Sequence, residues 1–218
     1  MQIAKTEHTS ALGIYALSKS IATKDEWDEA KKVSQETIVF MDETNGKFDG
    51  HHPQAYAIAH CQVAPIPEPL RLFVVAKELV LPEKPESDKQ TLVNTFFEAQ
   101  TIFNAEILEQ PAKVEKEVPH RKIVQDKDNP KNVRVEVAKE KKMISNVINV
   151  PEACMSFPQR KAKNTDRFYT VKVRYQYLHK GLLGTSVKTF EGWVEGLKAH
   201  ILQHECDHFQ AKNIFHKT

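Results

Sequence analysis

The sequence predicts an α+β fold in which antiparallel β-sheets pack around a C-terminal helix with a metal-binding HExxH motif. Three observations predict this class: a capped amphipathic helix near the N-terminus, apolar or alternating strand patterns in the middle, and two histidines on one stripe of a final helix. No segment repeats at a fixed period, so the pattern is typical of an α+β domain with two or three helices.

Length and charge exclude several classes of protein. The 218 residues suit a single domain, 1–218. Lysine and arginine number 31 against 29 acidic residues, and this near-balance argues against a dedicated nucleic-acid-binding protein. The N-terminal residues carry no apolar core of signal-peptide length, and no apolar run approaches the roughly 18 residues that span a bilayer, so we expect a cytoplasmic protein without a membrane partner. Three cysteines at irregular spacing favour burial or metal ligation over a disulfide framework.

The first elements follow from capping and periodicity. Thr23 and Glu26 have the spacing of a capping box, and the apolar residues behind them recur at helical spacing, so 24–43 is predicted to be an amphipathic helix. Asn45-Gly46 and Asp49-Gly50 predict a loop after it. The apolar, valine-rich stretch from Leu70 to Leu81 predicts a buried strand, and Thr101 to Leu108 predicts another.

A change of composition marks the segment 111–145. Ten basic and six acidic residues lie there, and Asp128 to Lys131 form a turn signal at its centre. Weak alternation on both sides of the turn predicts an exposed hairpin or a partly mobile excursion, inserted into the domain and not a second domain. Its net charge of +4 is compatible with an acidic partner, although a solvated charged surface is the alternative.

The last third of the chain predicts a hairpin followed by a helix. From Tyr169 to Tyr177, large apolar side chains alternate with polar ones, as in a half-buried strand. His179-Lys180-Gly181 predicts the turn, and Thr185 to Phe190 the antiparallel return strand. A final helix is predicted from about Glu191 to Gln210.

The final helix carries the chemistry. Val194, Leu197, Ile201, His204 and His208 are spaced by three or four residues and form one stripe on the side that faces the core. Histidines at positions i and i+4 can bind one ion together. Glu205 points slightly aside, where it can reach a water on that ion, and Asp207 can support a ligand from behind.

A catalytic ion of this type needs a third protein ligand. Ala211 and Ile214 occupy the positions where a metzincin would have glycine and histidine, and no glutamate follows at the distance seen in thermolysin-like proteases before Thr218. We therefore expect the ligand from earlier in the chain, where Cys154 is the candidate.

Cys154 lies in the segment Pro151-Glu152-Ala153-Cys154-Met155-Ser156, and with His204-Glu205-Cys206-Asp207-His208 it resembles peptide deformylase, whose second and third motifs are EGCLS and HExDH. Residues 55–63 are similar to a degraded form of the first motif, GxGxAAxQ, and end on Gln62-Val63. The order and approximate spacing of the three motifs match over most of 15–216.

The resemblance implies a metal centre and a reaction. Cys154, His204 and His208 would hold one divalent ion, Fe²⁺ in the family with Zn²⁺, Ni²⁺ or Co²⁺ as substitutes. Glu205 would act as general base and then general acid on a formyl group. The Gln62 side chain and the Met155 backbone N–H would stabilise the oxyanion.

The resemblance also implies a substrate site. The residues expected there are Tyr56, Ala57, Val150, Glu152, Leu197 and Ile201, with ordinary core packing as the alternative for the apolar ones. Glu152 is expected to organise the site through Arg167 or Arg160, unless it is a plain surface carboxylate. His200 is expected to be a partly exposed spectator that could shift the pKa of its neighbours.

Some residues depart from the family pattern. Family glycines are replaced by Ala55, Ala57, Ala153 and Ala211, which could narrow the cleft because glycine lets a substrate backbone approach closely. Enterobacterial members carry a helical tail that docks on the ribosome, whereas this chain stops soon after the third motif. A contact with the ribosome near the exit tunnel is thus absent or supplied elsewhere, and a divergent, phage-encoded member acting in the host cytoplasm would fit.

The implied partners are formylated nascent peptides, with no direct nucleic-acid partner. Three functions remain open: removal of the N-formyl group from formylmethionine, binding of metal and peptide without catalysis, and hydrolysis of another N-acyl group. The intact Glu205 and Gln62 favour the first, and the alanine-for-glycine changes motivate the second.

Overall fold

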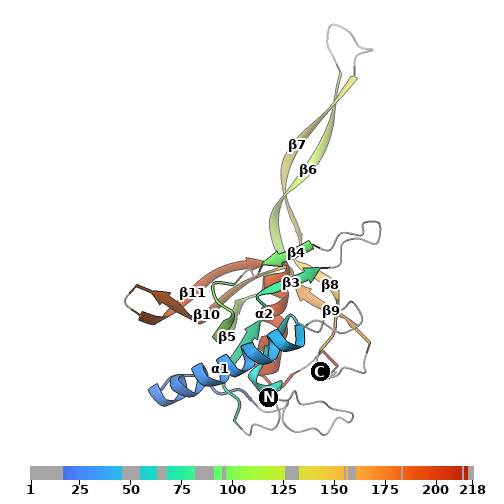
Figure 1. Cartoon of the computed structure of the whole chain (residues 1–218). Coiled ribbons are helices and arrows are strands. Elements are labelled where there is room, and N and C mark those ends of the chain that lie inside the picture. Colours follow the sequence, from blue (N-terminus) through green and yellow to red (C-terminus); the bar gives the residue numbers. More distant parts are fainter. Residues whose placement is uncertain are drawn as a thin grey trace.

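The computed structural model describes residues 17–45, 55–62, 68–81, 91–94, 97–125, 133–154, 156, 161–182, 184–212 and 214–215. Helix α1 lies across one side of a body of strands, helix α2 runs through that body, and one long hairpin projects far from it (Figure 1). Neither α-helix is long and apolar enough to cross a membrane in the described part of the chain.

Helix α1 (Lys24–Asn45) forms where the capping pattern predicts it. The Glu26 backbone N–H donates to the Thr23 hydroxyl at 3.2 Å, and the Glu26 carboxylate accepts from the Thr23 N–H at 2.8 Å. These reciprocal bonds satisfy amides that have no partner within the helix. The apolar side of α1 then packs on the sheet, where Ala30 is fully buried and Trp27 lies against Phe103.

A five-stranded antiparallel sheet forms the centre, in the order β1-β2-β5-β10-β11. Its strands are β1 (Ala57–Ala59), β2 (Leu72–Val75), β5 (Thr101–Glu109), β10 (Thr170–Gly181) and β11 (Gly184–Glu195). Val171, Val173 and Tyr175 of β10 are buried, which confirms the predicted alternation. The main hydrophobic cluster joins this sheet to α2 (Gly196–Phe209), so the sheet determines where the motif helix lies.

The predicted single strand from Leu70 to Leu81 is wrong. The chain forms β2, whose four residues are all buried, and then β3 (Glu78–Leu81), which pairs with β4 (Thr91–Asn94) in a separate two-stranded sheet. Two charged residues, Lys77 and Glu78, interrupt the apolar stretch at the break, and the pairing partner changes there. Periodicity records burial and not the identity of the neighbouring strand, so it does not show that the second part pairs in another sheet.

The charged segment is a hairpin, as predicted. Strands β6 (Lys113–Gln125) and β7 (Val133–Ser145) pair over their whole length, from Lys113 with Ser145 to Gln125 with Val133. The turn predicted at 128–131 lies outside the described residues, as do most of the loop predicted after Asn45 and the second motif's Met155. Strands β8 (Val147–Glu152) and β9 (Lys163–Phe168) form another antiparallel pair directly after the hairpin.

Two boundaries near the C-terminus differ from the prediction. Strand β10 continues through His179 to Gly181, which pairs with Gly184, so the turn lies after the predicted one. Strand β11 continues to Glu195, and α2 begins only at Gly196, whereas the prediction began the helix at Glu191. Pairing with β10 extends β11 through a sequence that also fits a helix, and Gly196, at a φ of +62°, permits the change of direction.

Candidate metal centre and substrate site

Three side chains from two parts of the chain meet beside α2. Cys154 follows β8, and His204 and His208 lie one turn apart on the helix. The Cys154 Sγ lies 3.5 Å from the His208 Nε2, which in turn lies 3.3 Å from the His204 Nε2. All three potential ligand atoms lie within 4.8 Å of one another, so this group could hold a metal ion.

The distances fit a single tetrahedral ion. Typical metal–nitrogen distances of about 2.0–2.1 Å and metal–sulfur distances of about 2.3 Å place two ligand nitrogens about 3.3 Å apart, and a nitrogen and a sulfur about 3.5 Å apart. The observed separations have these values. Two imidazoles and one thiolate leave a fourth position for water, as catalytic sites of this type require.

The protonation of the two histidines differs. Burial lowers the pKa of His204, but hydrogen bonds with Cys154 and Glu152 outweigh it and raise that pKa to about 10. Burial, followed by the charge of His204, holds the pKa of His208 well below its usual value. An ion bound here would displace the proton of His204, so metal affinity should rise with pH.

Glu205 lies next to this group with one oxygen unsatisfied. The residue is 2% exposed, and its Oε2 has no hydrogen-bond partner among the described residues. Burial raises the pKa of Glu205 to about 7. A buried polar atom normally has a partner, so this oxygen is suited to accept a proton from a water molecule near neutral pH.

Gln62 is held so that its amide group faces Cys154. It lies in the 3₁₀ helix η2 (His60–Gln62) that follows β1. Its Oε1 accepts from the Ala59 N–H at 2.7 Å, which leaves the Nε2 to donate to the Ser156 Oγ at 3.2 Å and the Cys154 Sγ at 3.6 Å. The donor predicted from the sequence is therefore buried, oriented and close to the candidate metal ligands.

Glu152 is the centre of a buried network. Arg167 donates to it from Nε at 2.5 Å and from Nη2 at 2.9 Å, the His200 Nε2 lies 2.6 Å away, and the His204 Nδ1 lies 2.9 Å away. Burial raises the pKa of Glu152, but hydrogen bonds from Arg167 and the two histidines lower it far more. The carboxylate is fully engaged with protein groups, which supports the organising role and not the expected contact with substrate.

The network fixes the orientation of one candidate ligand. A proton on the His204 Nδ1 is held by Glu152, which leaves the Nε2 free to bind an ion. Arg167 also donates from Nη1 to Asp207 at 2.6 Å, so the Asp207 of the motif supports His204 through Arg167 and Glu152 and does not contact it directly. Of the two arginines considered from the sequence, Arg167 is the partner, and Arg160 lies outside the described residues.

Four of the residues expected to line an apolar pocket lie close together. Ile201 belongs to the main hydrophobic cluster, and Tyr56, Ala57 and Leu197 pack against it. Val150, half-buried on β8, lies outside that cluster. Tyr56 and Leu197 are only partly buried, so part of each side chain remains in contact with solvent.

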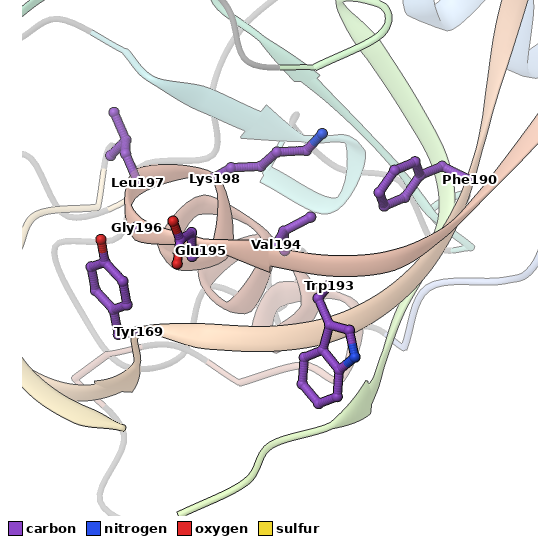
Figure 2. A pocket seen from close by; sticks show the side chains of 8 residues that line it. All are labelled: Tyr169, Phe190, Trp193, Val194, Glu195, Gly196, Leu197 and Lys198. Atoms are coloured by element: carbon purple, nitrogen blue, oxygen red, sulfur yellow. The ribbon is translucent and has the colours of Figure 1, made fainter. Parts of the chain in front are cut away.

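Leu197 also lines a pocket of about 480 Å³ that was not predicted from the sequence. Figure 2 shows its side chains where β11 passes into α2. They are Tyr169, Phe190, Trp193, Val194, Glu195, Gly196, Leu197 and Lys198. Leu197 precedes His204 by seven residues, so the pocket lies about 10 Å from the metal ligands along the helix.

Two polar contacts of the site were also missed. His200, expected to be a spectator, bonds to Glu152, and the hydroxyl of the fully buried Ser156 accepts from Gln62. The helical spacing of His200 from His204 was visible in the sequence and places both on one face. No sequence signal reveals the contact of Ser156 with Gln62, because 94 positions separate the two residues.

The alanines at family glycine positions differ in their surroundings. Ala55 is buried and Ala57 half-buried beside the site, whereas Ala153 is exposed. Ala211 has a φ of +57°, its N–H donates to the His208 carbonyl, and the Lys212 N–H donates to the Asp207 carbonyl. These two bonds are those of a Schellman motif, so the glycine expected at Ala211 would end the helix and not admit substrate backbone.

Known proteins that are similar to this chain belong to one family. A model of the family described as polypeptide deformylase matches residues 15–218. A search among curated proteins finds none that matches.

Solved structures of the same family are similar in fold. Peptide deformylase 1B of Arabidopsis thaliana is 18% identical over 99% of this chain and 80% of that chain, with a TM-score of 0.52. The deformylase of the Vibrio parahaemolyticus bacteriophage VP16T, solved with actinonin, is 16% identical over 98% of this chain and 100% of its own, also at 0.52. A class I type b peptide deformylase of Acinetobacter baumannii is 19% identical over 97% and 94%, at 0.51. The fold and the family predicted from the motifs are confirmed.

Proposed function

The chain belongs to the polypeptide deformylase family of enzymes, and we propose that it removes the N-formyl group from the N-terminal formylmethionine of newly made peptides and releases formate. One observation carries the proposal. Glu205 is buried with an unpaired carboxylate oxygen directly beside a cysteine and two histidines whose ligand atoms have the spacing of a single metal centre.

The proposed metal centre consists of Cys154, His204 and His208. An ion bound by them would lower the pKa of a water molecule and supply hydroxide near neutral pH. We propose Fe²⁺, with Zn²⁺, Ni²⁺ or Co²⁺ as substitutes, because one thiolate and two imidazoles suit all four ions. Glu152 keeps the His204 ring in the orientation that presents its Nε2.

Glu205 handles the protons of the proposed reaction. Its carboxylate takes a proton from the attacking water and then passes it to the departing amine, which becomes the free N-terminus of the peptide. A pKa of about 7 suits both steps, since the group must accept and release a proton at the same pH. Burial, with 2% exposure, also keeps bulk water from competing for that proton.

Gln62 is proposed to stabilise the oxyanion that develops on the formyl oxygen. Its Oε1 is held by the Ala59 N–H, so the amide does not need to reorient when charge develops. A preorganised donor of this kind typically contributes about 3–4 kcal/mol to lowering the barrier. The Met155 N–H, outside the described residues, is proposed as the second donor.

The substrate is proposed to lie against Tyr56, Ala57, Val150, Leu197 and Ile201, which would surround the methionine side chain. We also propose that the whole chain, 1–218, is one domain and that the 111–145 hairpin is an insertion in it. A cytoplasmic location follows from the substrate, since newly made peptides appear there, and contact with the ribosome would bring the enzyme close to them.

The test is formate release from formyl-Met-Ala-Ser by protein loaded with Fe²⁺ under anaerobic conditions. The proposal predicts turnover that disappears with a chelator and in Glu205→Ala. Glu117→Ala is the matched control, since Glu117 is an exposed glutamate of the hairpin. Turnover no faster than that of Glu205→Ala, with metal bound, would overturn the proposal.

A substrate panel separates the alternatives. Formyl, acetyl and longer acyl groups on Met-Ala-Ser, and formyl peptides with other first residues, are compared under the same conditions. Faster release of acetyl or longer groups would make the chain a hydrolase of another N-acyl amine. Metal binding with retained affinity for formyl-Met-Ala-Ser or actinonin, but no release of any acyl group, would make it a binding protein.

A further inference from the structure

The hairpin of β6 and β7 projects from the body as a two-stranded ribbon, with no other element of the described chain beside its outer part (Figure 1). Each strand has 13 residues, which corresponds to a reach of about 40 Å. Val137 and Met143 are 65% and 63% exposed. The outer part of the ribbon neither packs into the hydrophobic core nor covers the candidate metal centre. We therefore look for its function in the side chains on its surface.

The hairpin concentrates the positive charge of the chain. Residues 111–145 contain ten basic and six acidic residues, a net charge of +4, whereas the whole chain has 31 and 29, a net charge of +2. The remaining residues therefore have 21 basic and 23 acidic residues and a net charge of −2. The near-neutral total conceals an excess of positive charge on the projecting ribbon and an excess of negative charge elsewhere.

Both faces of the ribbon are positive. Paired residues of an antiparallel hairpin share a face, so the register assigns the described charged side chains to two sets. One face has Lys113, Lys139 and Lys141 with Glu115 and Glu117, and the other has Lys116 and Lys142 with Glu140. Each face therefore has a surplus of one cation among the described side chains.

The lysines remain available for an anionic partner although most are paired with glutamates. Lys139 bonds to Glu117 at 3.3 Å and Lys141 to Glu115 at 3.0 Å, but the side chains of these lysines are 77% and 66% exposed. Ion pairs in such contact with water contribute little stability and are screened by salt. A phosphate that bonds to these lysines therefore displaces only weak contacts.

The base of the ribbon is held by hydrogen bonds to the start of β10. The fully buried Asn146 donates from Nδ2 to the carbonyls of Pro111 and Thr170, both at 2.7 Å, and its Oδ1 accepts from the Thr170 N–H at 2.8 Å. The Lys116 ammonium lies 3.6 Å from the centre of the Tyr169 ring. Strand β8, which leads to Cys154, begins directly after Asn146, so an anchored ribbon would also orient the candidate active site.

We propose that the β6–β7 hairpin is a docking arm for folded RNA, bound through phosphates in a groove that contacts both faces of the ribbon. Positive charge on both faces favours binding in a groove of the RNA, where both faces of the ribbon can contact phosphates. A flat membrane surface would contact only one face. The two exposed apolar side chains, Val137 and Met143, are separated by Lys139 and Lys141 and do not form a membrane-inserting patch. Phosphate contacts give affinity without base specificity. The choice of RNA rests on the proposed function. Newly made peptides, the proposed substrates, appear at the site of translation, where folded RNA is present.

The experiment measures binding of a labelled RNA stem–loop at a series of salt concentrations. The test variant combines Lys113→Gln, Lys139→Gln, Lys141→Gln and Lys142→Gln. The control variant combines Lys24→Gln, Lys32→Gln, Lys180→Gln and Lys188→Gln, four exposed lysines outside the hairpin, so the same charge is removed from both variants. Melting curves confirm that both are folded, and formate release from formyl-Met-Ala-Ser is measured separately.

The proposal predicts at least tenfold weaker RNA binding by the hairpin variant than by the control variant near physiological salt. The slope of log Kd against log salt should fall by about 0.7–0.9 for each phosphate that the variant no longer binds. Equal binding by the two variants, or tighter binding to phosphatidylglycerol vesicles than to RNA, would overturn it. Absence of formate release from the unsubstituted protein would instead count against the proposed function, since RNA binding is read without substrate.

Discussion

Glu152 and Glu117 both lie in β-strands and both pair with a cation, but the two ion pairs differ in their exposure to solvent. Glu152 is 4% exposed and shares its carboxylate among Arg167, His200 and His204. The Glu117 side chain is 53% exposed and pairs with Lys139. The same charge therefore holds an active-site ligand in one region and remains exchangeable in the other, because only the buried pair is shielded from solvent.

Charged side chains have two different roles in this chain, one at the buried metal centre and one on the exposed hairpin. At the metal centre, most buried polar atoms have partners within the protein, and the exceptions among the described residues there are the Glu205 Oε2 and the His208 Nδ1. On the hairpin, ion pairs in contact with water can be exchanged for those of another molecule. Substitutions in the first region should thus alter activity and stability, and those in the second should alter binding.

Replacing Glu205 should have the largest effect. Glu205→Gln keeps the size of the side chain but removes the proton acceptor, so kcat/KM for formyl-Met-Ala-Ser should fall by about 10²–10⁴. The three metal ligands are intact, so bound metal measured by elemental analysis should not change. Glu117→Gln should retain full activity, and an active Glu205→Gln variant with bound metal would remove Glu205 from the mechanism.

Breaking the two glutamate pairs tests the comparison directly. Glu152→Gln leaves the buried Arg167 without its main counter-charge and should cost about 3–5 kcal/mol in urea unfolding. It should also weaken metal binding about 10–100-fold through His204. Glu117→Gln should change stability by less than about 1 kcal/mol. Similar losses in the two variants would show that burial does not distinguish the regions.

A buried histidine near the site gives a pH test. Burial lowers the pKa of His60 from 6.5 to about 4, and its Nδ1 accepts from the Leu70 N–H. The unfolded chain takes up a proton on this residue below pH 6.5 while the folded protein does not, so its contribution to stability is lost as pH falls from about 6.5 to about 4.

His60→Gln should therefore lose less stability than the unsubstituted protein between pH 7.5 and pH 4.5, measured from urea midpoints. His179→Gln, at an exposed position of β10, is the control and should leave that difference unchanged. An identical pH dependence in all three proteins would refute the account of His60.

The smallest effect is expected at the end of the motif helix. Ala211 has a positive φ, which costs a residue with a Cβ atom about 1 kcal/mol relative to glycine. Ala211→Gly should raise the free energy of unfolding by about that amount without changing KM. Ala30→Gly, inside α1, should lower it by at least as much. A destabilised Ala211→Gly variant would contradict the Schellman geometry.

Local signals in the sequence determined several elements and the candidate ligands. The capping bonds between Thr23 and Glu26, the alternation of β10, the charged hairpin and the stripe of His204 and His208 depend on residues close together in the chain, where spacing alone specifies geometry. Cys154 was a candidate because no suitable ligand follows the HExxH motif, and the family motifs then supported it and supplied Gln62, since nothing local to either residue indicates a metal centre.

Only the tertiary structure decided the rest. Strand pairing divided 70–81 between two sheets and extended β11 to Glu195, because a strand is completed by its neighbour and not by its own sequence. The same holds for Glu152, which the sequence left between an organising residue and a surface carboxylate. Its contacts with Arg167, His200 and His204 span 15 to 52 positions, and contacts over such separations exist only once the sheets and α2 have packed together.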